Sequence, residues 1–293
     1  MLGSGWCTAQ QHVNAPHAKA RALLLLSDIA LKRKRSLSQQ TGGPDRVSLD
    51  ARLDLVTAID VPCRRRRDGV SGMHAEERIE RARVAYERAV YAGETAGLTG
   101  AEQDLDKVEA DLALARGRIL HARFLEDRQE ATHELALFER ATQLYRTLGD
   151  LPGLAESLFW VGCFHQVVRG DTRTAIPLFE QSYELATQAG DRFTQSEVLR
   201  HLGIAEHSAG RLEAARERLE ESIRLRREIG LLAGVASNQV GLIYIAVAEN
   251  RSSDALALAD EAYATAADCG AERIMRQVEE ARTQITMPAA DQG

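Results

Sequence analysis

Apolar and small residues recur along most of this chain at helical spacing, and certain landmarks return about every forty residues. Four glycines, each following a helical segment, stand 41, 40 and 40 residues apart. They are Gly149, Gly190, Gly230 and Gly270. Three alanines keep the same forty-residue interval, namely Ala175, Ala215 and Ala255. Because independent landmarks share one period, the pattern predicts an internal repeat of helical units.

The unit over residues 190–229 predicts two antiparallel helices joined by a turn at residues 209–211. Two such helices need small residues where their backbones approach, and Gly203 and Ala215 provide them. Leu202 and Leu219 are large enough to fill the space opposite. One pair of this kind buries too little apolar surface alone, so neighbouring units are expected to stack. The glycines that close each unit suit the left-handed conformation at a helix end.

The same spacing extends weakly beyond the three clear units. A helical stripe from Ile79 to Ala89 predicts a helix over residues 76–96, and residues 270–284 predict a terminal capping helix. The predicted repeats lie at about 111–148, 149–189, 190–229 and 230–269, within a repeat domain over 74–285. Residues 286–293 are predicted to be a flexible tail. The predicted fold is all-α, a right-handed α-α superhelix.

Residues 1–73 differ from the rest in pattern and charge. Residues 1–72 carry 12 Lys and Arg against 6 Asp and Glu, whereas residues 73–293 carry 25 against 37. The basic clusters at 32–35 and 64–67 invite a nucleic-acid or nuclear-address role, but such runs are usually solvated, disordered tails. A disordered extension is therefore expected. The alternative is that residues 1–72 are no part of the working protein, with Met73 as its start. The acidic remainder argues against general nucleic-acid binding.

The arrangement within each unit resembles the tetratricopeptide repeat, in the forty-residue form found in kinesin light chains, G-protein-signalling modulators and bacterial regulator sensor domains. The middle unit matches best, with Leu202-Gly203, Gly210 and Ala215 in register. The first unit carries one extra residue before its turn, and the third carries two, with Asn250 near its turn in place of glycine. The predicted structural positions are Gly162, Gly203 and Gly241 on the first helices and Ala175, Ala215 and Ala255 on the second helices.

The resemblance implies a concave groove lined by the first helix of each unit. Counting back two and three positions from the mid-helix glycine gives six predicted groove residues: Phe159, Trp160, Arg200, His201, Asn238 and Gln239. Phe159 and Trp160 also fit an alternative role in packing between units. The subset of the family that clamps a terminal carboxylate has Lys and Asn in this region. This chain has Phe159, Cys163, Arg200 and Ile204 there instead. It is therefore not expected to capture acidic chain ends.

Motifs for chemistry are missing from the sequence. The four cysteines stand at least 56 residues apart, so there is no CxxC pair, and His201 and His207 are six residues apart, on different faces of one helix. There is no GxSxG motif and no P-loop. The sequence therefore predicts no enzyme, no metal and no cofactor. The longest apolar run near the N-terminus, residues 22–26, is too short to cross a membrane, so a cytoplasmic protein is expected.

Two functions remain open on the sequence. The first is an interaction module, a scaffold or adaptor that holds a protein or peptide partner in the groove. The second is a regulatory sensor domain that binds a small molecule or a signal peptide. The partner is expected to be neither a nucleic acid nor a membrane.

Overall fold

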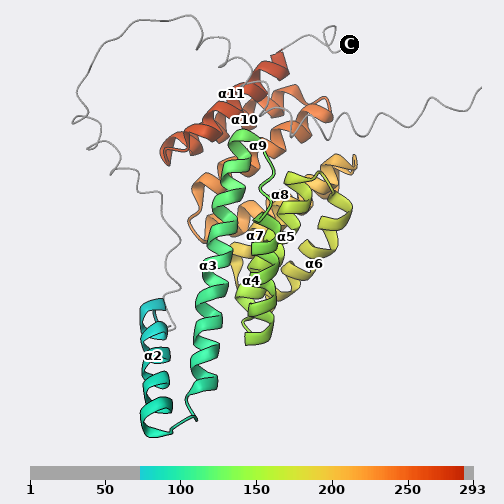
Figure 1. Cartoon of the computed structure of the whole chain (residues 1–293). Helices are drawn as coiled ribbons and strands as arrows, with labels where there is room; N and C mark the ends of the chain where they lie inside the picture. Colours follow the sequence, from blue (N-terminus) through green and yellow to red (C-terminus); the bar gives the residue numbers. More distant parts are fainter. Residues whose placement is uncertain (1–72, 287–293) are drawn as a thin grey trace, which may run out of the picture.

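The computed structural model describes residues 73–286, which fold into α-helices that pack in consecutive antiparallel pairs (Figure 1). No strand occurs within this range. The all-α prediction is therefore confirmed. The predictions made for residues 1–72 and for the last seven residues lie outside the described part of the chain. The helices are α2 (Ala75–Ala92), α3 (Leu98–Asp127), α4 (Glu134–Leu148), α5 (Leu151–Cys163), α6 (Thr172–Gln188), α7 (Arg192–Ser208), α8 (Leu212–Glu228), α9 (Leu232–Ala248), α10 (Ser252–Asp268) and α11 (Glu272–Thr286).

The forty-residue period is visible in the helix bounds. α9 and α10 begin and end forty residues after α7 and α8. The four glycines that close the units have φ between 64° and 71°, so each takes the left-handed conformation predicted for it. Asn250 has φ 59° and replaces glycine at the turn between α9 and α10. Asparagine accepts this conformation more readily than most residues.

The extra residue of the first unit lies in a π-helical turn, η2 (Phe164–Val168), which follows α5 directly. The amide of Arg169 donates to the carbonyl of Phe164 at 3.2 Å, five residues back rather than four. A π-turn is how a helix absorbs a single inserted residue without losing its path. The predicted insertion is thus confirmed, and the turn at Gly170 keeps its register with α6.

The third unit requires a correction. Its two supposed extra residues do not exist, because α7 and α9 have equal lengths and a forty-residue offset. The residue equivalent to Gly203 is therefore Ile243, which is fully buried, and not Gly241. A Cβ atom on Gly241 would meet Leu219 of the preceding unit at 2.8 Å. Gly241 thus gives room to the neighbouring unit rather than to its own second helix.

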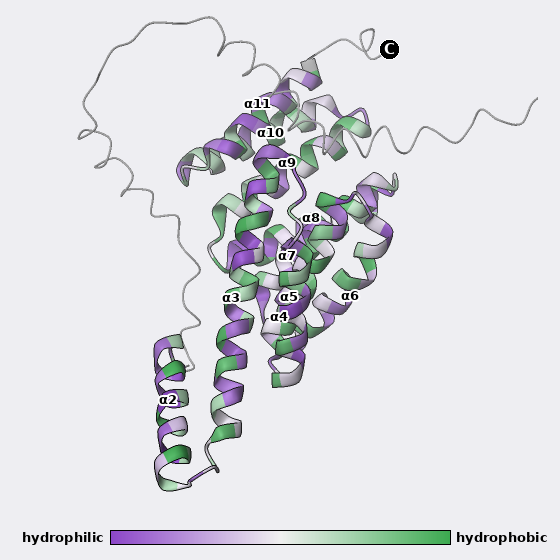
Figure 2. Ribbon diagram, viewed as in Figure 1, coloured by the Kyte–Doolittle hydropathy of each residue, from purple (hydrophilic) through white to green (hydrophobic). Residues whose placement is uncertain are grey.

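Small and large residues complement each other between the helices. A Cβ on Gly162 of α5 would lie 2.6 Å from the ring of Phe179 on α6, so only glycine fits there without a shift. Ala175, Ala215 and Ala255 are all fully buried at the start of the second helices. The described core is accordingly built from alanine, leucine, valine and isoleucine, with a few aromatic rings. Figure 2 shows apolar and polar residues alternating along the helices of this region.

Candidate binding surface on the inner helices

The first helices of the units form one layer of the solenoid. α5, α7, α9 and α11 contact one another in this order, while α6 and α8 each pack between the first helices of their own and the next unit. The ring of Phe159 on α5 lies 5.3 Å from that of His201 on α7. Arg200 on α7 donates to the carbonyl of Ser237 on α9 at 3.0 Å. This inner layer is the face on which the groove was predicted.

Phe159 and Trp160, the two aromatic residues of the predicted groove, are packed between units. Phe159 is 3 % exposed and contacts the rings of Phe179 and His201. Trp160 is partly buried, with its ring stacked on Phe138 at 5.5 Å and the guanidinium of Arg118 5.6 Å from it. In this arrangement Phe159 has no surface to offer a partner, whereas Trp160 retains an exposed part.

His201 is held as a neutral ring. Its Nδ1 lies 2.6 Å from the amide oxygen of Gln166, and the amide nitrogen of Gln166 donates to the His201 carbonyl at 3.0 Å. Burial, together with the nearby Arg200 charge, lowers the pKa of His201 well below its usual value. A neutral ring whose Nδ1 donates to Gln166 leaves Nε2 as an acceptor facing the Cys163 thiol, 3.7 Å away.

The order thiol, imidazole, amide resembles the order of a nucleophile, a base and an orienting group. The thiol of Cys163 is 1 % exposed, and burial raises its pKa well above the ordinary value. A buried, protonated thiol neither reaches a substrate nor attacks one. We therefore assign no catalytic role to these residues.

Arg200 and His201 are the two polar residues of the predicted set that stay partly exposed on the inner layer, and Arg200 is the charged one. One guanidinium nitrogen donates to the Ser237 carbonyl at 3.0 Å and to the side-chain oxygen of Asn238 at 3.1 Å. Within the described residues it forms no ion pair with a carboxylate. Burial and the positive charge of Arg226 lower the pKa of Arg200 to about 10. These two hydrogen bonds go to neutral oxygens, while the nearby Glu197 carboxylate acts on the Arg200 charge without forming an ion pair with it.

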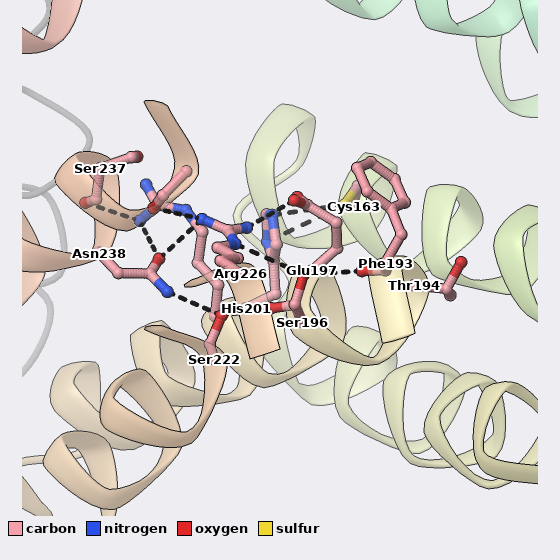
Figure 3. A network of polar contacts seen from close by, with 12 residues as sticks. Cys163, Phe193, Thr194, Ser196, Glu197, His201, Ser222, Arg226, Ser237 and Asn238 are labelled. Carbon is pink, nitrogen blue, oxygen red and sulfur yellow. Dashed lines mark hydrogen bonds and ion pairs between the residues drawn. The ribbon is translucent and has the colours of Figure 1, made fainter. Parts of the chain in front are cut away.

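Behind Arg200 lies a polar network that the sequence analysis missed (Figure 3). Arg226 of α8 is 2 % exposed and donates to Glu197 at 2.5 Å, to the Gly234 carbonyl at 2.8 Å and to Asn238 at 3.0 Å. Asn238 in turn donates to Ser222 at 2.7 Å. Two guanidinium groups therefore share the oxygen of Asn238, while Glu197 pairs with Arg226 alone.

A positional signal could have revealed Arg226. Its equivalents forty residues before and after are Ala186 and Ala266, so an arginine stands where the other units have alanine. The next unit makes room for it with Gly234, where a Cβ would lie 2.9 Å from the arginine side chain. The same compensation occurs at the start of the solenoid, where Tyr145 packs over Gly153.

The corrected register explains why two predicted groove residues are buried. Asn238 and Gln239 are equivalent to Val198 and Leu199, which are core residues in their own unit. Asn238 is fully buried within the network, and Gln239 is 1 % exposed with neither amide atom hydrogen-bonded. The residues equivalent to Arg200 and His201 in α9 are Val240 and Gly241. The prediction that Asn238 and Gln239 line a groove stays untested by any bound partner.

Two hollows in the described part of the chain lie away from the predicted groove residues. One of about 360 Å³ lies between α3 and α4, and one of about 350 Å³ lies among α8, α9 and α10. Neither is lined by a predicted groove residue. Within residues 73–286 no group of three or more His, Cys, Asp or Glu side chains could hold a metal ion. No helix in that range is long and apolar enough to cross a membrane.

Comparison with known proteins agrees with the repeat architecture. The family model of the tetratricopeptide repeat matches residues 164–228, which run from the π-turn through α6, α7 and α8. No curated protein matches the sequence of the chain. The matched segment contains Arg200, His201 and Arg226, and the helix pairs on either side continue its geometry. Residues 164–228 therefore form a tetratricopeptide repeat region, a kind of domain that generally mediates protein interactions.

Proposed function

We propose that this chain is an interaction module whose inner layer binds an acidic segment of a protein or peptide partner, with Arg200 as the anchor. The observation that carries the proposal is the state of Arg200, a partly exposed cation with no carboxylate in ion-pair distance among the described residues. A partner carboxylate would replace water with a charge-assisted hydrogen bond, which is about twice as strong as a neutral one.

The surroundings favour a protein segment over a free anion. Ile204 lies one helical turn beyond Arg200 and is partly exposed. Tyr244, forty residues after Ile204, is also partly exposed, and burial raises the pKa of its hydroxyl to about 12. An acidic residue next to apolar residues would therefore find a cation and apolar contacts on adjacent helices. Half-buried aromatic and arginine side chains are frequent anchors of interfaces.

The test is a binding measurement with a matched control. The full chain would be screened against an array of immobilised peptides, and the best binders remade with each Asp or Glu replaced by its amide. We expect Arg200→Gln to weaken binding by about tenfold or more, as the loss of a hydrogen-bonded charge pair does. Arg218→Gln, which alters an exposed arginine on α8, should leave binding unchanged.

The proposed contact between Arg200 and a partner carboxylate is tested by combining Arg200→Gln with the amide peptide. If Arg200 contacts the carboxylate, the amide peptide should bind wild type and Arg200→Gln equally. Full binding by Arg200→Gln would exclude Arg200 as the anchor. If no peptide binds but a small molecule raises the melting temperature of the chain, the sensor function becomes the better proposal.

A further inference from the structure

The long helix α3 carries an apolar stripe on its outer side. Its members are spaced seven residues apart and are between 36 % and 58 % exposed: Leu98, Leu105, Leu112 and Ile119. The adjoining positions, three residues after each, are all small or apolar: Ala101, Val108, Ala115 and Ala122. Large and small apolar residues in this heptad order form the contact seam of a coiled coil. From Leu98 to Ala122 the seam is about 36 Å long.

The seam has no complete cover within the described chain. α2 packs beside the first half of α3 (Figure 1). Arg78 of α2 pairs there with Asp104 of α3 at 2.6 Å. α4 packs on the opposite side of the second half, as the contact between Gly117 and Phe138 shows. Ala115 and Ala122 remain exposed between them. In the first half of the seam Ala101 is buried and Val108 is partly buried, so the exposed part consists of the four large residues and the two alanines of the second half. An exposed apolar surface of this kind marks an interaction site.

Charged residues along one edge of the seam indicate which molecule would bind there. Four exposed residues seven positions apart follow this edge, two acidic and then two basic: Glu102, Glu109, Arg116 and Arg123. Glu109 pairs with Arg140 of α4 through an exposed bidentate contact, whereas the other three form no ion pair within the described residues. Two such edges match only when the helices run antiparallel, because a parallel pair would set acid against acid.

We propose that two copies of this chain associate through α3, antiparallel and around a two-fold axis near Leu112. In this arrangement Glu102 faces the partner's Arg123, and Glu109 faces the partner's Arg116. Each contact occurs twice, as a two-fold interface requires. Charged residues beside a coiled-coil seam set the partner and the direction of pairing.

The hollow beside the basic end of α3 fits the same arrangement. It measures about 360 Å³ and is lined by Ala115, Ile119 and Leu120 of α3 and by Leu137 of α4, with two arginines at its edge. The symmetry that pairs Glu102 with the partner's Arg123 brings the partner's Leu105 opposite Leu120. The apolar knob of one copy therefore faces the apolar hollow of the other.

The test is the oligomeric state of the full chain by sedimentation velocity over a range of concentrations. We expect wild type to form a dimer. An acidic variant, Arg116→Glu with Arg123→Glu, and a basic variant, Glu102→Arg with Glu109→Arg, should each raise the dissociation constant roughly tenfold or more, since like charges would then face each other. Mixing the two variants should restore a one-to-one dimer. The control, Arg173→Glu with Arg218→Glu on α6 and α8, should dimerise like wild type.

Leu112→Glu tests the apolar part of the seam and should also give a monomer. All variants change exposed side chains, so their circular dichroism spectra should equal that of wild type. A wild type that stays monomeric at every concentration would overturn the proposal. A dimer that persists in both charge variants, or variants that fail to associate when mixed, would overturn it as well.

Discussion

The middle of the solenoid and its N-terminal hairpin use similar helices with opposite results. α2 has 18 residues and an apolar stripe, yet none of its residues is buried. α7 has 17 residues and buries seven of them, including the polar Thr194 and Ser196. α7 has neighbours on several sides, whereas α2 contacts α3 alone among the closely packed pairs. Whether the apolar residues of a helix are buried in a repeat protein thus depends on how many neighbouring helices pack against it. An amphipathic pattern is not sufficient for burial.

The largest expected effect concerns charged side chains in the two regions. Arg226→Met should destabilise the protein by about 3 kcal/mol, because it leaves Glu197 and Asn238 without their buried partner. Arg83→Met removes two exposed ion pairs of α2 and should leave the melting temperature unchanged. Chemical denaturation of both variants measures the difference. Equal effects would contradict the view that the buried Arg226 contributes more to stability than the exposed Arg83.

Glycines in the two regions should respond in opposite directions. Gly203→Leu places a side chain where a Cβ alone would lie 3.1 Å from Leu219, so a loss of about 1 to 3 kcal/mol is expected. Gly100→Ala lies in open space at the start of α3 and should gain about 0.5 to 1 kcal/mol from better helix propensity. Thermal and urea unfolding report both changes. A neutral Gly203→Leu would mean that the two helices of the unit are packed more loosely.

Acid should act on the middle region through His201. Because the pKa of His201 is lowered in the folded protein, the unfolded chain binds the extra proton first, near pH 6.5. Stability should then fall as the pH drops below about 6.5, by at most about 1.4 kcal/mol per pH unit for this one group. The test is to measure the free energy of unfolding of wild type and of His201→Asn at several pH values between about 7.5 and about 5. Parallel curves would exclude His201 as the source.

A small change, a gain in stability, is expected at Gln239. Both of its amide atoms are buried without a hydrogen bond, and the equivalent residues of the other units are Leu158 and Leu199. Gln239→Leu should therefore stabilise the protein by about 1 kcal/mol. Ile79→Gln on α2 makes the reverse exchange at an exposed position and should change little. A destabilised Gln239→Leu would indicate that the amide has a partner in solution.

Much of the repeat followed from the sequence because it depends on local physics. Glycine at a helix end adopts φ > 0 in any fold, so Gly149, Gly190 and Gly230 marked the unit boundaries. The insertion before Gly170 was also countable. The register predicted for α9 is wrong because Gly241 and Gly203 are both glycines but do not occupy equivalent positions. Gly241 makes room for Leu219 of the preceding unit. A glycine in a helix indicates that another helix packs closely against it, but the sequence does not show which helix this is.

The sequence by itself determined the all-helical class, the forty-residue period and the unit boundaries. These depend on spacing along one chain, which the sequence records directly. Only the tertiary structure decided which side chains are buried together: the Arg226 network, the unpaired amide of Gln239 and the exposed seam of α3. Those features depend on which residues of other helices lie beside a side chain, or on the lack of a neighbour beside one helix. Burial is decided by what surrounds a side chain, and a pattern within one helix leaves that open.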